Sequence, residues 1–83
     1  MAVSLTPAPL IEQARARRLP LPPEARAIRM AANITQNELA KALGVHTVSV
    51  QRWEAGTRRP RGPVAERYAA LLAGLAEVAS DAS

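Results

Sequence analysis

The most constraining feature of this sequence is residues 35–54, TQNELAKALGVHTVSVQRWE, which predict two short helices joined by a tight turn. The first helix has a clear start, because Thr35 can act as the N-cap and Glu38, three residues later, completes a capping box. It also has a clear stop, because Gly44 follows its last apolar residue and can adopt the left-handed conformation that ends many helices. We therefore expect a helix over residues 36–43.

The second helix is expected at about residues 47–54 and has two unlike faces. Val50 and Trp53 are three residues apart, so they share the face that points to the core. The opposite face is formed by Thr47, Val48, Gln51 and Arg52. Two helices that cross steeply through a short glycine-containing turn form a helix-turn-helix, whose second helix enters the major groove of DNA. An ordinary helical hairpin in a small bundle is the alternative interpretation.

Composition narrows the classes of function. The 83 residues leave room for one small domain. There is no cysteine, no cluster of metal ligands and no paired carboxylates in a plausible pocket, so we expect no enzyme, no metal, no cofactor and no small-molecule ligand. The net charge of +4 favours a polyanionic partner, nucleic acid first. Without a long apolar run or a leader segment, we expect no membrane span and a cytoplasmic location.

Three further helices are expected around this pair, which makes the fold class all-α with five helices. They are expected at about residues 7–18, 23–32 and 62–79. Prolines between the first two break the chain, and Arg26 and Arg29 are expected on the outer side of the second. The domain limits that follow are 1–22 for an N-terminal helix and linker, 23–79 for the helix-turn-helix domain, and 80–83 for a frayed tail.

The densest positive charge in the chain follows the helix pair, in residues 55–63, AGTRRPRGP. Prolines keep this segment out of a helical conformation. It leaves the end of the helix that would enter the major groove, where DNA phosphates would lie. We therefore expect phosphate contacts from Arg58, Arg59 and Arg61, with a solvated loop as the alternative.

The last helix carries apolar residues at alternating spacings of four and three. Part of this stripe must close the core, and the part beyond Leu71 is expected to leave apolar surface exposed. The simplest partner for such a surface is a second copy of the chain. The homodimer would use Leu71, Leu72, Leu75 and Val78.

Residues 24–79 resemble the phage-repressor and Cro-like (XRE-type) helix-turn-helix family. The resemblance rests on ITQNELAKALGV for the first helix and turn, and on TVSVQRWEAGTRRP for the second helix and its exit. It covers about two-thirds of the chain. It implies a lambda-repressor-like helix-turn-helix fold, to which the N-terminal helix is an addition, and binding to double-stranded DNA.

The resemblance also implies roles for single residues. Gln36 corresponds to a glutamine that binds a phosphate and braces the second helix, which is the recognition helix of the family. The positions that read bases hold Thr47, Val48 and Arg52, with Gln51 on the same face. Arg29 and Glu54 match an ion pair, buried or half-buried, that ties the first helix of the domain to the recognition helix.

Two positions depart from the family pattern. His46 stands where the family has Ser or Thr as the cap of the recognition helix, so we expect weaker capping or donation of a hydrogen bond to a phosphate. Trp53 replaces Ile or Leu, and its register in the helix predicts a core position in an adjusted core.

These observations predict a sequence-specific regulator of transcription, bacterial or phage, that represses by occupying an operator as a dimer on a two-fold site. One alternative is an antitoxin-type module whose last helix binds a protein partner. Another is an excisionase-like or MerR-like accessory factor, which would carry a wing after the recognition helix. The last helix of this chain argues against that wing.

Overall fold

The computed structural model describes residues 9–11, 14 and 18–81. Its complete helices are α2 (Pro22–Ala31), α3 (Gln36–Leu43), α4 (Thr47–Ala55) and α5 (Gly62–Asp81). Residues 9–11 and 14 are also helical, and they belong to the expected N-terminal helix. The rest of that predicted helix lies outside the described residues. Within the described part of the chain the fold is all-α, as predicted.

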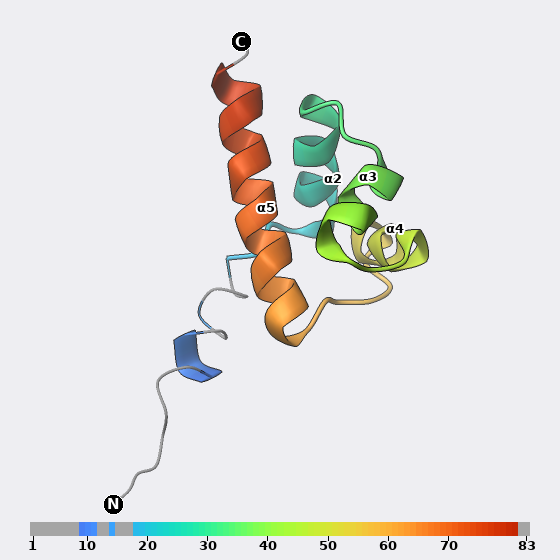
Figure 1. The fold of residues 1–83 in the computed structure, drawn as a ribbon, viewed down its shortest axis with the longest axis vertical. Coiled ribbons are helices and arrows are strands. Elements are labelled where there is room, and N and C mark those ends of the chain that lie inside the picture. The colour runs from blue at the N-terminus through green and yellow to red at the C-terminus, as the bar shows by residue number, and fades with distance from the viewer. Residues whose placement is uncertain (1–8, 12–13, 15–17, 82–83) are drawn as a thin grey trace, which may run out of the picture.

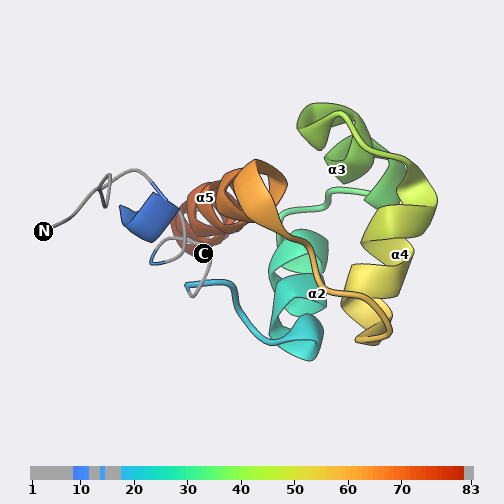
Figure 2. The same cartoon turned by 90° about the horizontal axis from the view of Figure 1, so that it is seen from below.

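α2 and α3 lie between the other two helices. Each of them packs against both α4 and α5 (Figures 1 and 2). α3 and α4 follow each other through a short turn and pack together, which gives the helix-turn-helix arrangement. Arg67 on α5 adds a tie to this pair, because its Nη2 donates to the carbonyl oxygen of Leu43 at the end of α3 over 3.2 Å.

The start and stop signals of α3 are confirmed. Thr35 Oγ1 accepts from the amide of Glu38 at 3.0 Å, and the Glu38 carboxylate accepts from the amide of Thr35 at 2.9 Å. The hydrogen bond that the Thr35 amide donates to this carboxylate, followed by the effect of the Thr35 side chain, holds the pKa of Glu38 below its ordinary value. Gly44 ends the helix with a left-handed φ of 71°. Local sequence therefore fixes where the first helix of the pair begins and ends.

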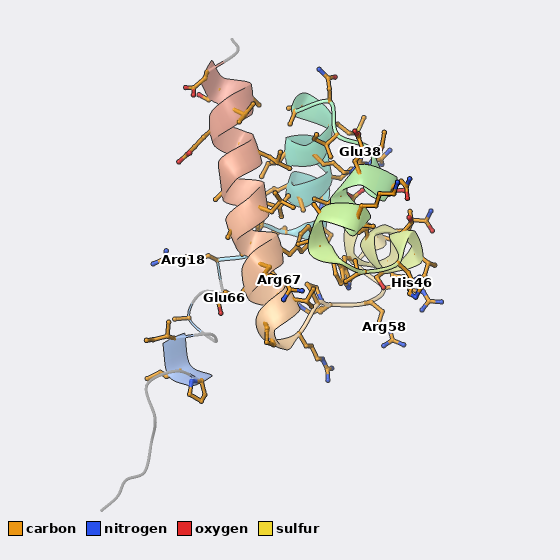
Figure 3. All side chains as sticks on the ribbon, in the orientation of Figure 1. Arg18, Glu38, His46, Arg58, Glu66 and Arg67 are labelled. Carbon is orange, nitrogen blue, oxygen red and sulfur yellow. The ribbon has the colours of Figure 1, made fainter. Side chains whose placement is uncertain are left out.

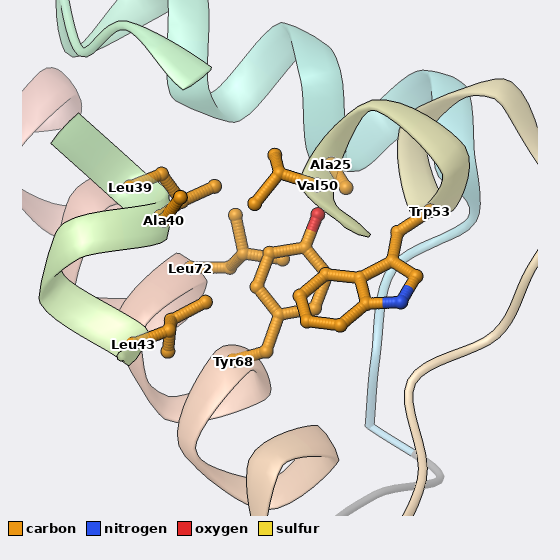
Figure 4. Packing of buried hydrophobic residues seen from close by; sticks show 8 residues of the cluster. All are labelled: Ala25, Leu39, Ala40, Leu43, Val50, Trp53, Tyr68 and Leu72. Carbon is orange, nitrogen blue, oxygen red and sulfur yellow. The ribbon is translucent and has the colours of Figure 1, made fainter. Parts of the chain in front are cut away.

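The core is closed by large side chains from α3, α4 and α5. Leu39, Val50 and Leu72 are fully buried at its centre. Trp53 is 8% exposed, which confirms its predicted core position. Its ring centroid lies 5.0 Å from that of Tyr68, with the ring planes tilted by 38° (Figure 4). The indole thus spans the space between the recognition helix and α5, which a smaller side chain at this position would leave open.

The Tyr68 hydroxyl is the exception in this core. It is buried and has no hydrogen-bond partner among the described residues. Burial in the apolar core raises the pKa of Tyr68 to about 12, because the phenolate would have to lose its solvation there. The nearby Glu54 carboxylate raises this pKa further, and Arg29 opposes the effect.

The structure corrects three expectations about α2 and α5. Arg29 does not lie on the outer side of α2 but is 8% exposed, because its guanidinium is paired with a carboxylate from α4. α2 begins at Pro22, one residue earlier than expected, since proline is tolerated in the first turn. α5 continues to Asp81, so two residues of the predicted frayed tail belong to it.

The predicted partner surface on α5 also needs a correction. Leu72 is 0% exposed and belongs to the core, so it cannot contact a second chain. Leu71 and Leu75 are partly buried against the same core. Val78 is 60% exposed.

None of the helices in the described residues, the 20-residue α5 included, is long and apolar enough to cross a membrane.

Candidate nucleic-acid interface

α4 presents a polar face outward while its other face is held in the core. Val50, Trp53 and Glu54 are buried. On the opposite side Gln51 and Arg52 are exposed, and Val48 is 45% exposed. Thr47, at the start of the helix, is half-buried. The structure therefore brings the four residues predicted to read bases onto one accessible side of α4.

A buried ion pair fixes α4 to α2. Arg29 Nε donates to Glu54 Oε2 over 2.6 Å, and Arg29 Nη2 donates to Glu54 Oε1 over 3.0 Å. Arg29 Nη1 also donates to the carbonyl oxygen of Ile34 over 2.8 Å. The hydrogen bonds to Glu54 raise the pKa of Arg29, and burial opposes this effect only in part. The two-point geometry holds the orientation of α4 as well as its distance from α2.

Gln36 connects α3 to the same carboxylate. Its Nε2 donates to Glu54 Oε1 over 3.1 Å. Glu54 thus accepts from residues of α2 and α3 at once, and the three helices meet at one side chain. The glutamine lies where it braces the recognition helix, and its side chain is half-buried at the edge of the exposed surface.

One contact at this interface was missed by the sequence analysis. Thr47 Oγ1 donates to Asn37 Oδ1 over 3.0 Å, which ties the first residue of α4 to the second residue of α3. Both types of side chain are common at helix starts, so neither residue signals the pair by itself. The Asn37–Thr47 hydrogen bond depends on the angle at which α3 and α4 cross. This crossing angle cannot be read from the spacing of the two residues in the sequence.

His46 occupies the N-cap position of α4 without acting as a side-chain cap. Its backbone is extended, with φ −75° and ψ 147°, and its side chain makes no capping hydrogen bond. Its carbonyl oxygen accepts from the amide of Ser49 at 2.9 Å. The imidazole is exposed and lies at the surface beside α4 (Figure 3). Weaker capping than by Ser or Thr follows directly from this geometry.

The arginine loop, residues 57–61, follows α4, and backbone hydrogen bonds fix the conformation of its first residues. Gly56 has a φ of 77°, and the amides of Thr57 and Arg58 both donate to the carbonyl oxygen of Arg52, at 3.0 and 3.3 Å. The exposed arginines of the loop are Arg58, Arg59 and Arg61. Together with Ser49 and Arg52 they line a hollow of about 880 Å³. This hollow therefore has positive charge on both walls.

These features define a helix-turn-helix domain with a basic, polar recognition surface. A family model described as helix-turn-helix matches residues 26–74, which is more than half of the chain, and the chain therefore belongs to the XRE-type helix-turn-helix family. Comparison with curated proteins and with solved structures gave no match. Membership of this family identifies the protein as a DNA-binding helix-turn-helix regulator.

The described residues contain neither a cluster of metal ligands nor the hairpin of a winged accessory factor. In the part of the chain that the structure describes, no group of three or more His, Asp or Glu residues could hold a metal ion. After α4 come the arginine loop and α5, where a winged accessory factor would have a hairpin. The family is one of DNA-binding regulators and is typically non-enzymatic.

Proposed function

We propose that this protein is a sequence-specific regulator of transcription that represses by placing α4 in the major groove of double-stranded DNA. The observation that carries the proposal is the division of α4 into two faces. Val50, Trp53 and the Glu54 ion pair hold one face rigidly, so the other is presented in a fixed orientation. A rigid reading face is what discrimination between base pairs requires.

Each residue of that face suits a particular contact. Arg52 can donate to O6 and N7 of a guanine, and Gln51 can bond bidentately to an adenine. Val48 offers a methyl surface to a thymine. Thr47 contacts a base edge or a phosphate at the start of the helix. The phosphates around the site are contacted by Gln36, His46, Arg58, Arg59 and Arg61, which supply affinity and salt dependence with little sequence information.

We further propose that the protein acts as a homodimer on a two-fold site in the bacterial cytoplasm, or in the host cytoplasm if a phage encodes it. The support is the C-terminal end of α5, which projects past α2 (Figure 1) and leaves Val78 60% exposed. Leu71 and Leu75, which are partly buried against the core, come before this end on the same helix. Two half-sites about one helical turn apart are the expected operator for such a dimer.

The proposal is tested by selecting bound fragments from a genomic DNA library at two salt concentrations. Wild-type protein is compared with Arg52→Ala and with a matched control, Arg18→Ala, whose side chain lies on the opposite side of α5 from α4 (Figure 3). We expect one enriched, roughly palindromic sequence for the wild type and the control. Arg52→Ala should lose about 1–3 kcal/mol of discrimination at one base pair. Binding that is uniform across sequences and equally strong in all three proteins would contradict specific recognition.

A further inference from the structure

A second hollow lies beside α4, separate from the one at the arginine loop. Its volume is about 290 Å³, and its walls come from α2, from the start of α3 and from α4. The residues that line it are Arg26, Arg29, Gln36, Gln51, Glu54 and Ala55. The two hollows share no residue, and each takes a different set of α4 side chains as one wall. The exposed face of α4 is therefore flanked on two sides by hollows that contain arginine.

The net positive charge of the residues that line this second hollow is carried by one of them. The Arg29 guanidinium is balanced by the Glu54 carboxylate, which also accepts from Gln36. Arg26 is exposed on α2, one turn before Arg29, and has no ion pair or hydrogen bond among the described residues. Two arginines against one glutamate leave the lining with one excess positive charge, carried by Arg26. The hollow is thus suited to an anion.

DNA places an anion on each side of a helix that lies in its major groove. The groove is bordered by two sugar-phosphate backbones that belong to opposite strands, about 12 Å apart. The arginine loop borders one side of α4, and α2 and the start of α3 border the other side. A contact to the second strand must come from the side where α2 and the start of α3 lie.

We propose that Arg26 binds a backbone phosphate on the strand opposite to the one contacted by Arg58, Arg59 and Arg61. This inference rests on the proposed function and adds to it a second side of the protein–DNA contact. Together the two hollows clamp the DNA from both borders of the groove. The Arg29–Glu54 pair lines the same hollow as Arg26 and joins α2 to α4. It therefore keeps Arg26, on α2, at a fixed distance from the exposed face of α4.

The experiment compares wild type with Arg26→Gln, Arg26→Lys and the charge-matched control Arg18→Gln, each on the selected site and on random DNA. We expect Arg26→Gln to weaken binding to all sequences alike. The slope of log K against log salt should become shallower by about 0.9, as for the loss of one phosphate contact. Arg26→Lys should restore the slope, and Arg18→Gln should leave it unchanged. Circular dichroism of each variant checks that the exposed substitution leaves the fold intact.

Phosphate ethylation interference then locates the contact. In the wild type, ethylation should interfere with binding at phosphates on both strands, and Arg26→Gln should lose one interfering phosphate on the strand opposite the arginine loop, where the contact of Gln36 remains. A triple Ala variant of the arginine loop should lose those on the other strand. If Arg26→Gln matches Arg18→Gln in slope and in interference pattern while the wild type binds DNA, the proposed phosphate contact of Arg26 is refuted and the proposed function stands. If the wild type binds no DNA, both are refuted.

Discussion

The Arg29 guanidinium on α2 and the Glu54 carboxylate on α4 lie 2.6 Å apart at Nε and Oε2, and their side chains are only 10% and 3% exposed. A buried pair of this kind does not have to stabilise the fold over an apolar pair of similar volume, because both ions lose their hydration. The effect of the Arg29–Glu54 pair on the orientation of α4 is clearer than its effect on stability. Two hydrogen bonds to one carboxylate set the rotation of the recognition helix as well as its position.

Removing only one partner of this pair should be far more harmful than removing both. Glu54→Leu leaves the Arg29 charge buried and unbalanced, and should reduce the free energy of unfolding by about 3–5 kcal/mol. The double variant Arg29→Met, Glu54→Leu should lose much less, because no charge is left in the core. Urea denaturation of wild type, Arg29→Met, Glu54→Leu and the double variant measures these effects. Losses that simply add in the double variant would show that the two side chains do not interact.

Tyr68→Phe should stabilise the protein. The Tyr68 hydroxyl is buried without a partner among the described residues, whereas its ring contacts Trp53, and phenylalanine keeps that contact. A buried unsatisfied hydroxyl costs about 1–3 kcal/mol, and removing it should recover about 1 kcal/mol. Thermal and urea denaturation at neutral pH provide the measurement. A marked loss of stability would mean that the hydroxyl has a bound water or another partner.

The raised pKa of Tyr68 predicts a loss of stability in alkali. The folded-state pKa is about 12 against an ordinary value of 10.0, so the unfolded chain loses this proton first. Below pH 10 the residue makes no pH-dependent contribution, and between pH 10 and 12 it lowers the free energy of unfolding by up to about 1.4 kcal/mol per pH unit. Denaturation midpoints across this range should therefore fall more steeply for wild type than for Tyr68→Phe. Parallel curves would argue against the shift.

Two apolar residues six positions apart on α5 should behave differently. Leu72→Ala removes a fully buried side chain and should cost about 2–5 kcal/mol of stability. Val78→Asp changes a side chain that is 60% exposed and should alter monomer stability by no more than about 0.5 kcal/mol. If Val78 contacts a second copy, sedimentation should show weaker self-association for Val78→Asp. Unchanged self-association would move the dimer contact elsewhere.

The features that local sequence could predict are those that depend on neighbours in the chain. Thr35, Glu38 and Gly44 determine the limits of α3 through hydrogen bonds and backbone conformation within a few residues, and the structure has them where they were expected. The two faces of α4 follow in the same way from helical periodicity. Such features need no knowledge of how helices dock.

The features that were missed depend on docking. Periodicity counts every arginine as a surface residue, so it placed Arg29 outward. Only the family resemblance implied the ion pair with Glu54 that draws Arg29 inward. The apolar stripe of α5 did not reveal that Leu72 faces α2 and α3, because spacing alone does not say which part of a stripe the neighbouring helices cover. The Asn37–Thr47 hydrogen bond and the hollow beside Arg26 likewise arise only where separate helices meet.

The segment before α2 has a consequence for how this domain can be trimmed. Leu19 packs against the core, and residues 19–22 line a hollow that also contains Trp53 and Tyr68. Pro22 lies 3.8 Å from the position that a Cβ on Gly56 would take, and the expected limit between residues 22 and 23 falls inside α2. A fragment cut to the family match at residue 26 would lose this cover and the first turn of α2. A fragment that keeps Trp53 and Tyr68 covered must therefore include Leu19 and the residues after it.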